Sequence, residues 1–548
     1  MSRPPGDPAG IIAEFGTGRV PPGLSPATHA GAIMTTAISR SGSLPRLAVA
    51  ALVLALAPAS AGAATVTNLT LAASYDSLAE ALARARDDDT IEITGAQAGN
   101  FIVAKRIALI GKADGGAPST LDGGGAGTVL TVKAAGTVID GLTIRHSGRG
   151  TDIWALWGDA GVFVDADNVS LRNLKIIDND WGVVFHGGVG SLIEMSVVED
   201  NIRHGIRIVG GHEHRIIANS INRNSVGVSV DALFAGTQSS PLGNLASPDA
   251  ARLLALQRQV AVRSQDVLVA DNTVRGNGSY GIEVAWESER ITVRSNEVHK
   301  TGIERPVDQA LIASWQQSVG RGAGVPVTLD RSPYGSGIYL FCLVTESTVI
   351  GNQSHDNASA GIGLSIVNDN SVVANTVSDN RVGIAVEASN RNTFARNLVT
   401  GNADHGIIIA ATNPGAAASG DNLLTLNDMS ANGVNAFDSS GRVLSDADIM
   451  KMIDAMPMLD AAKRQLHASR QMREAMLKAM RAQLKPAANR WDDGTYGNRY
   501  EDFDEVAEGF RDRDQDGIGE AAHKIPGGSS VDRHPLSEER IADLRQTD

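Results

Sequence analysis

The sequence predicts an all-β fold, a single-stranded right-handed parallel β-helix, and three observations support this prediction. A Gly-aliphatic strand motif recurs every 22 or 23 residues in its regular blocks. Asparagines repeat with the same period. The composition, with 59 glycines and 4 % aromatic residues, suits many short strands joined by tight turns. The glycines are Gly182, Gly205, Gly227, Gly361, Gly383 and Gly406, and the asparagines are Asn352, Asn375, Asn397, Asn357, Asn380 and Asn402.

The repeat length selects the architecture. Strands this short cannot bury two faces alone, but stacked coils share one continuous core. Alternation along each strand turns Ile282 and Val284 inward and the residue between them outward. The asparagines fall at corners, where left-handed backbone and side-chain-to-backbone hydrogen bonds are needed. Three strands per coil follow, whereas a propeller blade is about twice as long and a leucine-rich frame is absent from the sequence.

The N-terminal region predicts export. Residues 1–33 are rich in Pro and Gly and are expected to be a wrongly assigned start, with Met34 as the true one. Residues 34–63 have the pattern of a signal peptide, with two arginines before an apolar run and Ala61-Gly62-Ala63 as the cleavage site. The run is too short to span a bilayer. A periplasmic or secreted protein without a membrane span is therefore expected.

Residues 64–442 form the predicted β-helix, with two interruptions. Residues 75–87 have helical spacing and are expected to cap the N-terminal end of the core. The motif glycines are 54 residues apart between Gly227 and Gly281 and 56 apart between Gly281 and Gly337. Insertions of about 232–263 and 301–334 explain these intervals, and such insertions become loops on the wall that favour binding sites.

Residues 443–485 leave the repeat and predict a helical hairpin, with Ser445 or Asp446 as N-cap and Pro457 near the bend. The hairpin holds seven of the eleven methionines. Thioethers bind Cu(I), which would make it a copper site. Packing or docking of a partner protein is the alternative, because methionine adapts to irregular apolar contacts. Residues 486–548 form a C-terminal segment.

Outward positions of the motif strands collect ionisable and aromatic side chains around the Gly281 coil. Neighbouring coils are about 4.8 Å apart, so these side chains can converge on one sugar unit. Because they point away from the core, we expect them to be exposed and to contribute little to stability. The candidate catalytic residues are Arg207, Asp231, Glu283, Tyr339 and His204, and the candidate substrate-binding residues are Asp165, His186, Tyr280 and Trp286.

Two chemistries fit this cluster, and a solvated wall without chemistry is the alternative. Asp231 and Glu283 can form the carboxylate pair of a retaining glycosidase. Alternatively, Arg207, His204 or Tyr339 takes the C5 proton of a uronate, while a carboxylate or calcium neutralises the sugar acid.

The sequence contains one stronger and one weaker candidate for metal binding. Asp512, Asp514 and Asp516 alternate before a glycine, as in the first half of an EF-hand loop, with Glu520 at the ninth position. We expect a structural Ca²⁺ there, and we expect its affinity to be weak because His523 replaces the glutamate of position twelve. The string His212-Glu213-His214 lacks further ligands nearby in sequence, so a solvated corner is favoured over a metal pair.

Charge and cysteine content exclude several classes. The net charge is −14, whereas a nucleic-acid-binding protein needs a basic footprint. The single Cys342 excludes an intrachain disulfide and a thiolate cluster, and its apolar surroundings in sequence favour a small buried hydrophobe.

The segments LDGGGAGTVLTV (121–132) and IDGLTIRHSG (139–148) resemble the opening coils of NosD-type proteins. The run from Asn498-Arg499-Tyr500 through DRDQDGIGE to IPGGSSVDRHPL (525–536) resembles their closing motif, so the resemblance covers about 75–440 and 489–537. It implies the carbohydrate-binding and sugar-hydrolase (CASH) superfamily, a pectate-lyase-like fold shared by polysaccharide lyases, hydrolases and uronate epimerases.

The resemblance leaves two functions open. The first is an exported protein that binds or modifies a polysaccharide along one face. The second is a NosD-like periplasmic accessory that serves copper-site assembly in nitrous oxide reductase and works with an ABC transporter. Fold analogy alone does not choose between them.

Overall fold

The computed structural model describes residues 65–150, 157–234, 261–309, 333–410, 419–442, 445–455, 460–483 and 486–546. Residues 1–63, for which the sequence predicts a wrongly assigned start and a signal peptide, lie outside the described residues. Most of each insertion also lies outside them. No helix in the described ranges is long and apolar enough to cross a bilayer.

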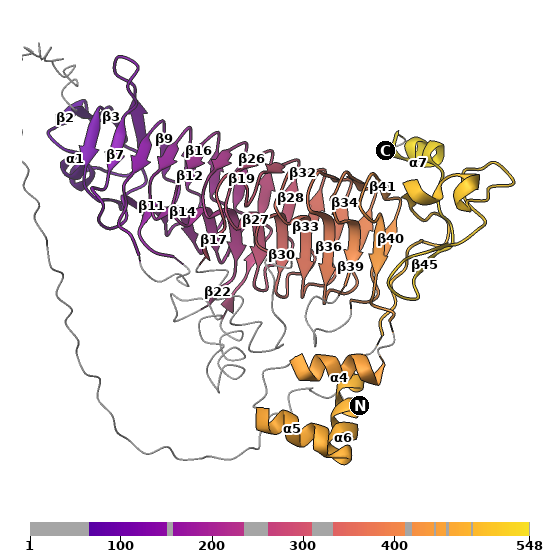
Figure 1. The fold of residues 1–548 in the computed structure, drawn as a ribbon. Coiled ribbons are helices and arrows are strands. Elements are labelled where there is room, and N and C mark those ends of the chain that lie inside the picture. Colours follow the sequence, from indigo (N-terminus) through magenta and orange to yellow (C-terminus); the bar gives the residue numbers. More distant parts are fainter. Residues whose placement is uncertain are drawn as a thin grey trace, which may run out of the picture. The chain divides into compact units, whose positions relative to one another are not determined.

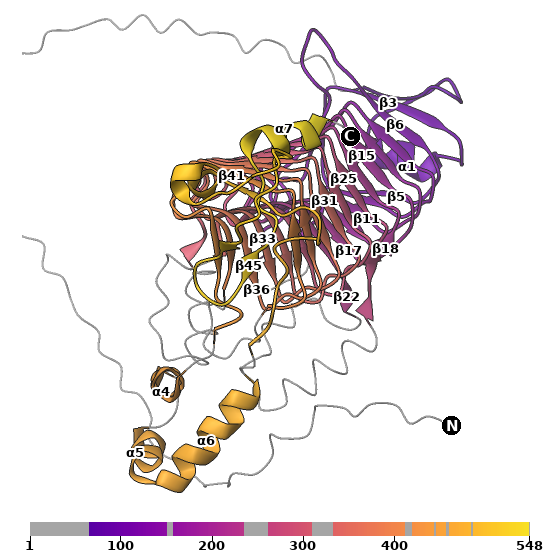
Figure 2. The ribbon, with the colours of Figure 1, turned by 90° about the vertical axis from the view of Figure 1, so that its right-hand side faces the viewer.

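Three long sheets form the walls of a parallel β-helix, in which each coil contributes one short strand to each wall (Figures 1 and 2). This confirms the predicted fold class. Among the described strands, successive coils pair in parallel, and antiparallel pairing in these walls involves only β1 with its neighbours β2 and β3 at the N-terminal end. Sheets A, B and C have 14, 13 and 12 strands among the described residues.

Sheet A consists, in spatial order, of β2 (Ala73–Tyr75), β1 (Thr65–Asn68), β3 (Thr90–Thr94), β6 (Ala108–Lys112), β9 (Val138–Asp140), β12 (Ser170–Arg172), β15 (Leu192–Glu194), β19 (Arg215–Ile217), β25 (Leu268–Ala270), β28 (Thr292–Arg294), β31 (Thr348–Ile350), β34 (Ser371–Val373), β37 (Thr393–Ala395) and β40 (Leu423–Thr425). Sheet B consists of β4 (Ala96–Ala98), β7 (Thr120–Asp122), β10 (Thr143–Arg145), β13 (Lys175–Ile177), β16 (Val197–Glu199), β20 (Ser220–Asn222), β26 (Thr273–Arg275), β29 (Glu297–His299), β32 (Gln353–His355), β35 (Thr376–Ser378), β38 (Leu398–Thr400), β41 (Asp428–Ser430) and β43 (Arg499–Tyr500).

Sheet C carries the Gly-aliphatic motif. It consists of β5 (Phe101–Val103), β8 (Leu130–Val132), β11 (Ala160–Val164), β14 (Trp181–His186), β17 (His204–Val209), β21 (Val226–Asp231), β27 (Tyr280–Ala285), β30 (Ser336–Phe341), β33 (Ala360–Ser365), β36 (Val382–Glu387), β39 (His405–Ile409) and β42 (Ala436–Asp438). Small ladders pair β18 (Gly211–His212) with β24 (Ser264–Gln265), β22 (Leu233–Phe234) with β23 (Ala261–Val262), and β44 (His523–Lys524) with β45 (Val531–Asp532).

One continuous apolar core runs through the stack. Ile282 and Val284 are 0 % and 1 % exposed, as the alternation along the strand predicts. The same core cluster extends from Val66 in the first coil to Trp491 and Tyr500 after the last motif strand. The core is therefore filled by aliphatic side chains from three walls, which explains the low aromatic content of the sequence.

Buried asparagines form ladders along the corners. Asn375 is typical: its side-chain amide donates to Val349 O at 2.9 Å and to Asn397 Oδ1 at 3.0 Å. Its own Oδ1 accepts from the backbone N–H of Asn352 at 2.9 Å. The predicted hydrogen bonds are correct, but the left-handed residue precedes the asparagine: Ala374 has φ 55°. The asparagine side chain points inward and stacks on the next coil.

A short helix covers the N-terminal coil. Helix α1 (Leu78–Arg84) begins after Ser77, whose hydroxyl accepts from the Glu80 N–H at 3.2 Å. Leu78 and Ala81 are fully buried in the core. The helix is shorter than the expected 75–87 because Tyr75 belongs to β2 and Ser77 has extended backbone.

Three helices, not two, occupy the predicted hairpin: α4 (Asp446–Ala455), α5 (Asp460–Ala468) and α6 (Arg470–Gln483). Ser445 is the N-cap, since its hydroxyl accepts from the Asp448 N–H at 3.1 Å. Pro457 lies outside the described residues. The helices bury Ile449, Ile453 and Leu466, among others, in a cluster of their own.

Deleting 443–485 and joining the ends with a short Gly-Ser linker is expected to leave the β-helix folded. The flanking residues already meet, because Ala487 N–H donates to Ser440 O at 2.9 Å, and solenoid stability is roughly a sum of neighbour terms. Circular dichroism and a thermal melt measure the outcome. A lost β-type spectrum or a lost cooperative melt would show that the helices belong to the core.

The segment after the helices, residues 486–546 as described, covers the C-terminal end of the solenoid. Deleting it should have the opposite outcome to deleting the helices. The buried Asp438 carboxylate accepts from Trp491 Nε1 at 3.1 Å and from Ser530 Oγ at 2.7 Å. Residues 499–500 add the last strand of sheet B, and the short 3-10 turns Glu501–Phe503 and Val506–Glu508 and helix α7 (Glu538–Gln546) follow. Removing 486–548 should therefore lower the melting temperature clearly.

Candidate functional site

The outward column of sheet C is assembled as the alternation predicts. In the strand register, Arg207 lies opposite Ser229, Ser229 opposite Glu283, and Glu283 opposite Tyr339. In the second outward column, Val209 lies opposite Asp231. Four candidate residues therefore lie on the adjacent strands β17, β21, β27 and β30.

The expected exposure of these residues is wrong. Arg207, Asp231, Tyr280 and Tyr339 are 7 %, 1 %, 7 % and 8 % exposed. They point away from the solenoid core, yet they are buried in a second layer on the outer face of sheet C. Glu283 and His204 remain partly exposed. Replacing the buried members must therefore affect stability.

A charged network joins two of the coils. Arg207 and Asp231 form an ion pair at 2.8 Å with both side chains buried. The Ser229 hydroxyl oxygen lies 2.6 Å from Asp231 Oδ2 and 3.1 Å from Glu283 Oε2. A hydroxyl has one proton, so we infer that Ser229 donates to the nearer Asp231 and accepts from Glu283 when that carboxyl is protonated.

The surroundings of Glu283 raise the pKa of its carboxyl group to near neutral pH. Burial and then the negative charge of Asp231 raise the pKa of Glu283 to about 7, against the opposing effects of Arg207 and Ser229. A carboxyl group with this pKa exchanges its proton at physiological pH, which a general acid or base requires. Glu283 is thus the group of the cluster best suited to proton transfer.

His204 is held neutral. Arg207 Nη1 donates to His204 Nε2 at 3.0 Å, so the imidazole proton must lie on Nδ1. Burial and then the charge of Arg207 hold the pKa of His204 well below its usual value. The Trp181 ring stacks on this imidazole with centroids 4.6 Å apart and an interplanar angle of 12°. This arrangement suits a hydrogen-bond donor better than a base.

Three tyrosines lie beside Glu283. Tyr280 and Tyr339 stack with centroids 4.9 Å apart, and Tyr334 lies 5.5 Å from Tyr280. Burial raises the pKa of all three phenols, so they stay protonated at neutral pH. Tyr339 is therefore a donor here rather than a ready base.

The remaining substrate-binding candidates form neighbouring groups. His186 Nδ1 lies 3.3 Å from Asp165 Oδ1, and its ring stacks on Phe163 at 5.6 Å. Trp286 packs edge-on against Phe341 at 5.8 Å. These pairs flank the Arg207–Glu283 network along the same face.

The string His212-Glu213-His214 does not present a metal pair. His214 is 1 % exposed, its Nδ1 accepts from the Ser191 N–H at 3.2 Å, and its Nε2 lies 3.0 Å from Gly187 O. Both ring nitrogens are therefore occupied by backbone groups. His214 is a structural corner residue, so the expected solvated corner is wrong for this side chain.

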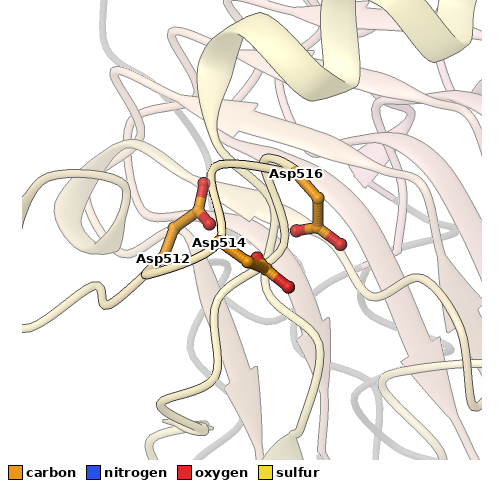
Figure 3. Close-up of side chains that lie close together, drawn as sticks. All are labelled: Asp512, Asp514 and Asp516. Carbon is orange, nitrogen blue, oxygen red and sulfur yellow. The ribbon is translucent and has the colours of Figure 1, made fainter.

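Three aspartates of the predicted calcium loop converge. Each of Asp512, Asp514 and Asp516 contributes a carboxylate oxygen, and these oxygens lie within 4.8 Å of one another (Figure 3). The negative charge of Asp516 raises the pKa of Asp514. Glu520 is outside this group and instead accepts from the Arg513 N–H at 3.0 Å. The donor set of hard oxygens fits Ca²⁺.

The methionine cluster is partly structural. Met480 is buried with Leu477, and Met450 and Met476 pack against the same cluster, whereas Met472 is 42 % exposed. The side chains of Met452, Met456 and Met458 lie outside the described residues. Packing thus accounts for three of the thioethers. Cys342 is half-buried rather than fully buried, in a left-handed turn with φ 56°.

Sequence reasoning missed two residues of the network. Ser229 joins both carboxylates, and its place in the outward column between Arg207 and Glu283 was the available signal. Trp181 opens its strand one coil before His204, and the repeat alone places the two side by side. Its stacking depends on side-chain packing that the repeat does not encode.

Comparison with known proteins gives two family matches. Residues 330–447 match the family described as periplasmic copper-binding protein (NosD), and residues 160–325 match the right-handed β-helix region. These matches confirm the NosD-type resemblance and the handedness of the fold. No curated protein matches the sequence.

Several solved structures resemble the chain. One is the periplasmic alginate epimerase AlgG, at 14 % identity over 63 % of this chain and 81 % of that chain, with a TM-score of 0.40. The A-module of mannuronan C-5 epimerase AlgE4 from Azotobacter vinelandii shows 14 % identity over 65 % and 86 %, with a TM-score of 0.35. An alginate lyase from Paenibacillus sp. shows 13 % identity over 66 % and 96 %, with a TM-score of 0.32.

Proposed function

We propose that this right-handed β-helix protein, NosD-type over residues 330–447, binds or modifies a polysaccharide on the outer face of sheet C. The observation that supports the proposal is Glu283, a carboxyl group with a pKa of about 7. Ser229 connects this carboxyl group to the buried Arg207–Asp231 ion pair. Acid–base work on a glycan needs such a group. We further propose that the protein works in the periplasm or outside the cell.

The geometry is compatible with two reaction types. The Asp231 and Glu283 oxygens that share the Ser229 hydroxyl, at 2.6 and 3.1 Å, are at most about 6 Å apart, near the separation of a retaining pair. Asp231, however, is buried and paired with Arg207. Glu283, acting as base on a sugar C–H, begins a lyase or epimerase reaction without exposing Asp231. Water would then supply the second proton, to the leaving oxygen in a lyase or to the opposite face of the sugar carbon in an epimerase.

A polysaccharide panel tests the proposal. The purified protein is incubated with neutral and acidic polymers, and binding, new reducing ends and ultraviolet absorbance of unsaturated products are measured. Binding or turnover that Glu283→Gln alters supports the proposal. If no polymer is bound or changed, the function is not carbohydrate-directed.

The family match keeps a second candidate, the NosD-like accessory of copper-site assembly, with the helices 445–483 as a partner-docking or Cu(I)-binding element. Met472 is the exposed methionine among the described side chains of these helices. Tight Cu(I) uptake by the full chain, lost when 443–485 are deleted, together with an empty polysaccharide panel, would favour this candidate over ours.

We propose Ca²⁺ as a structural cofactor of the loop with Asp512, Asp514 and Asp516. Its bound state should stabilise the fold by about 2.7 kcal/mol at a hundredfold excess over Kd, so EGTA should lower the melting temperature by about 2–5 °C. The triple Asp→Asn variant should not respond to EGTA. Equal melting of the wild type with Ca²⁺ and with EGTA would contradict the cofactor.

A further inference from the structure

Residues 461–485 carry a positive charge that contrasts with the rest of the chain. They contain seven arginines and lysines and one acidic residue, whereas the whole chain has a net charge of −14. Helices α5 and α6 occupy most of this segment. Their buried side chains pack in the separate cluster of the helices and not in the core of the solenoid. A basic helical element outside the main core is typical of a surface that binds an anionic partner.

Helix α6 has an exposed apolar face in addition to its buried one. Leu477 and Met480 are 9 % and 5 % exposed and pack inside the cluster of the helices. Met472 lies three residues before Ala475 and seven before Ala479, so the three share another face of the helix. Met472 is 42 % exposed, and both alanines are exposed. This face therefore meets solvent, not the apolar cluster of the helices.

Two basic side chains flank this exposed face, one on each side. Arg473 follows Met472 and Lys478 precedes Ala479, and successive residues of an α-helix are turned by about 100°. Arg473 and Lys478 are thus turned away from the face in opposite directions. Neither side chain forms an ion pair or a hydrogen bond within the described part of the chain.

The other arginines of α6 lie on the opposite side of the helix and are already paired. Arg470 lies two residues before Met472 and Arg481 nine residues after it, which turns each by about 160–180° from that side chain. Arg470 forms an ion pair with Glu474 at 2.7 Å, and Arg481 forms one with Asp446. The cations of α6 that the described residues leave unpaired are thus the two beside the exposed apolar face.

We propose that α6 binds the surface of an anionic phospholipid bilayer. Met472, Ala475 and Ala479 face the acyl chains. Arg473 and Lys478 reach the lipid phosphates on either side, as long basic side chains do at such interfaces. A soluble polyanion would pair with the two cations but leave the apolar face in water. A helix in this position lies on the bilayer without spanning it, and the contact is independent of the proposed polysaccharide function.

Co-sedimentation with vesicles tests the proposal. The chain from Ala64 onward contains every described residue and lacks the predicted signal peptide, whose apolar run would itself bind lipid. It is mixed with vesicles of phosphatidylcholine alone or of an equal mixture of phosphatidylcholine and phosphatidylglycerol, in EGTA. The wild type should sediment with the mixed vesicles and stay in solution with phosphatidylcholine. Equal sedimentation with both vesicles, or with neither, would overturn the proposal.

Two variants of α6 assign the binding to this face. Each basic residue near an anionic surface strengthens partitioning about fivefold, so Arg473→Gln/Lys478→Gln should lower the partition coefficient about 25-fold. Met472→Gln should lower it at least about threefold, because the side chain loses apolar contact with the acyl chains. Glutamine has nearly the helix propensity of the residues it replaces, so the helix should persist in both variants, as circular dichroism checks.

The matched control changes the same charge on the opposite side of the same helix. Arg470→Gln/Arg481→Gln should lower the partition coefficient by less than about twofold, because a helix is about 10 Å across and the Debye length is about 8 Å at physiological salt. If this variant loses as much binding as Arg473→Gln/Lys478→Gln, the attraction is diffuse and the proposed face is wrong.

Three further outcomes would overturn the proposal. Binding that survives deletion of 443–485 would place the lipid-binding surface elsewhere in the chain. Unchanged binding by Met472→Gln would reject the contact with the acyl chains. Binding that appears only when Ca²⁺ replaces EGTA would assign the lipid contact to Ca²⁺ bridging by the loop with Asp512, Asp514 and Asp516. None of these outcomes bears on the polysaccharide panel, so the two proposals fail separately.

Discussion

Glu283→Gln is expected to lower turnover of the saccharide by about 100- to 10,000-fold and to leave binding nearly unchanged. Glutamine keeps the size and the hydrogen-bonding oxygen of the side chain but cannot transfer a proton. In the wild type, the pKa of Glu283 at about 7 places a limb of the pH–rate profile near neutrality. That limb should be absent from the residual activity of the variant.

The sign of the limb identifies the role of Glu283. As a general acid it must be protonated, so the rate falls as pH rises through about 7. As a general base it must be ionised, so the rate rises over the same interval. Glu297→Gln, the same change at an exposed position of sheet B, is the control and should keep the wild-type profile. Wild-type turnover in Glu283→Gln would exclude Glu283 from the chemistry.

The repeat made the fold predictable. A 22- or 23-residue period leaves room for three short strands per coil, and parallel stacking then aligns equivalent positions of successive coils. The alignment of Arg207, Ser229, Glu283 and Tyr339 follows from this register alone. The repeat therefore predicts both sheet C and the column of outward-facing residues from which the candidate site is built.

The second buried layer was not predictable from the repeat. An outward position on a solenoid is normally solvated, and nothing in the 22-residue unit says that Asp231 and Tyr339 are covered. The corner chemistry has a similar limit. Composition signals an asparagine corner, but which residue takes φ near +55°, Ala374 or Asn375, depends on the inward turn of the amide side chain.

The hydrogen-bond partners within the network also could not be predicted from the sequence. Ser229 differs from the neighbouring small outward residues only through its contacts with two carboxylates. The neutral tautomer of His204 requires knowing that Arg207 donates to Nε2. These features depend on side-chain geometry at distances near 3 Å, which a periodic pattern cannot specify.

Arg207→Ala is expected to lower the free energy of unfolding by about 3–5 kcal/mol, because it leaves the buried Asp231 carboxylate without its partner. The ion pair is 2.8 Å long with side-chain exposures of 8 % and 2 %, so solvent cannot replace the lost guanidinium. The sequence-based expectation of little effect assumed an exposed side chain. Urea unfolding followed by circular dichroism measures the change.

An exposed ion pair on another wall is the control. Arg223 pairs with Asp200 at 2.6 Å and with Glu199 at 2.9 Å, and the Arg223 and Asp200 side chains are both 44 % exposed. Arg223→Ala should therefore cost no more than about 1 kcal/mol. The double variant Arg207→Leu/Asp231→Leu should recover most of the loss, since apolar side chains need no partner. If Arg207→Ala and Arg223→Ala are equally mild, water reaches Asp231 and the second layer is open in solution.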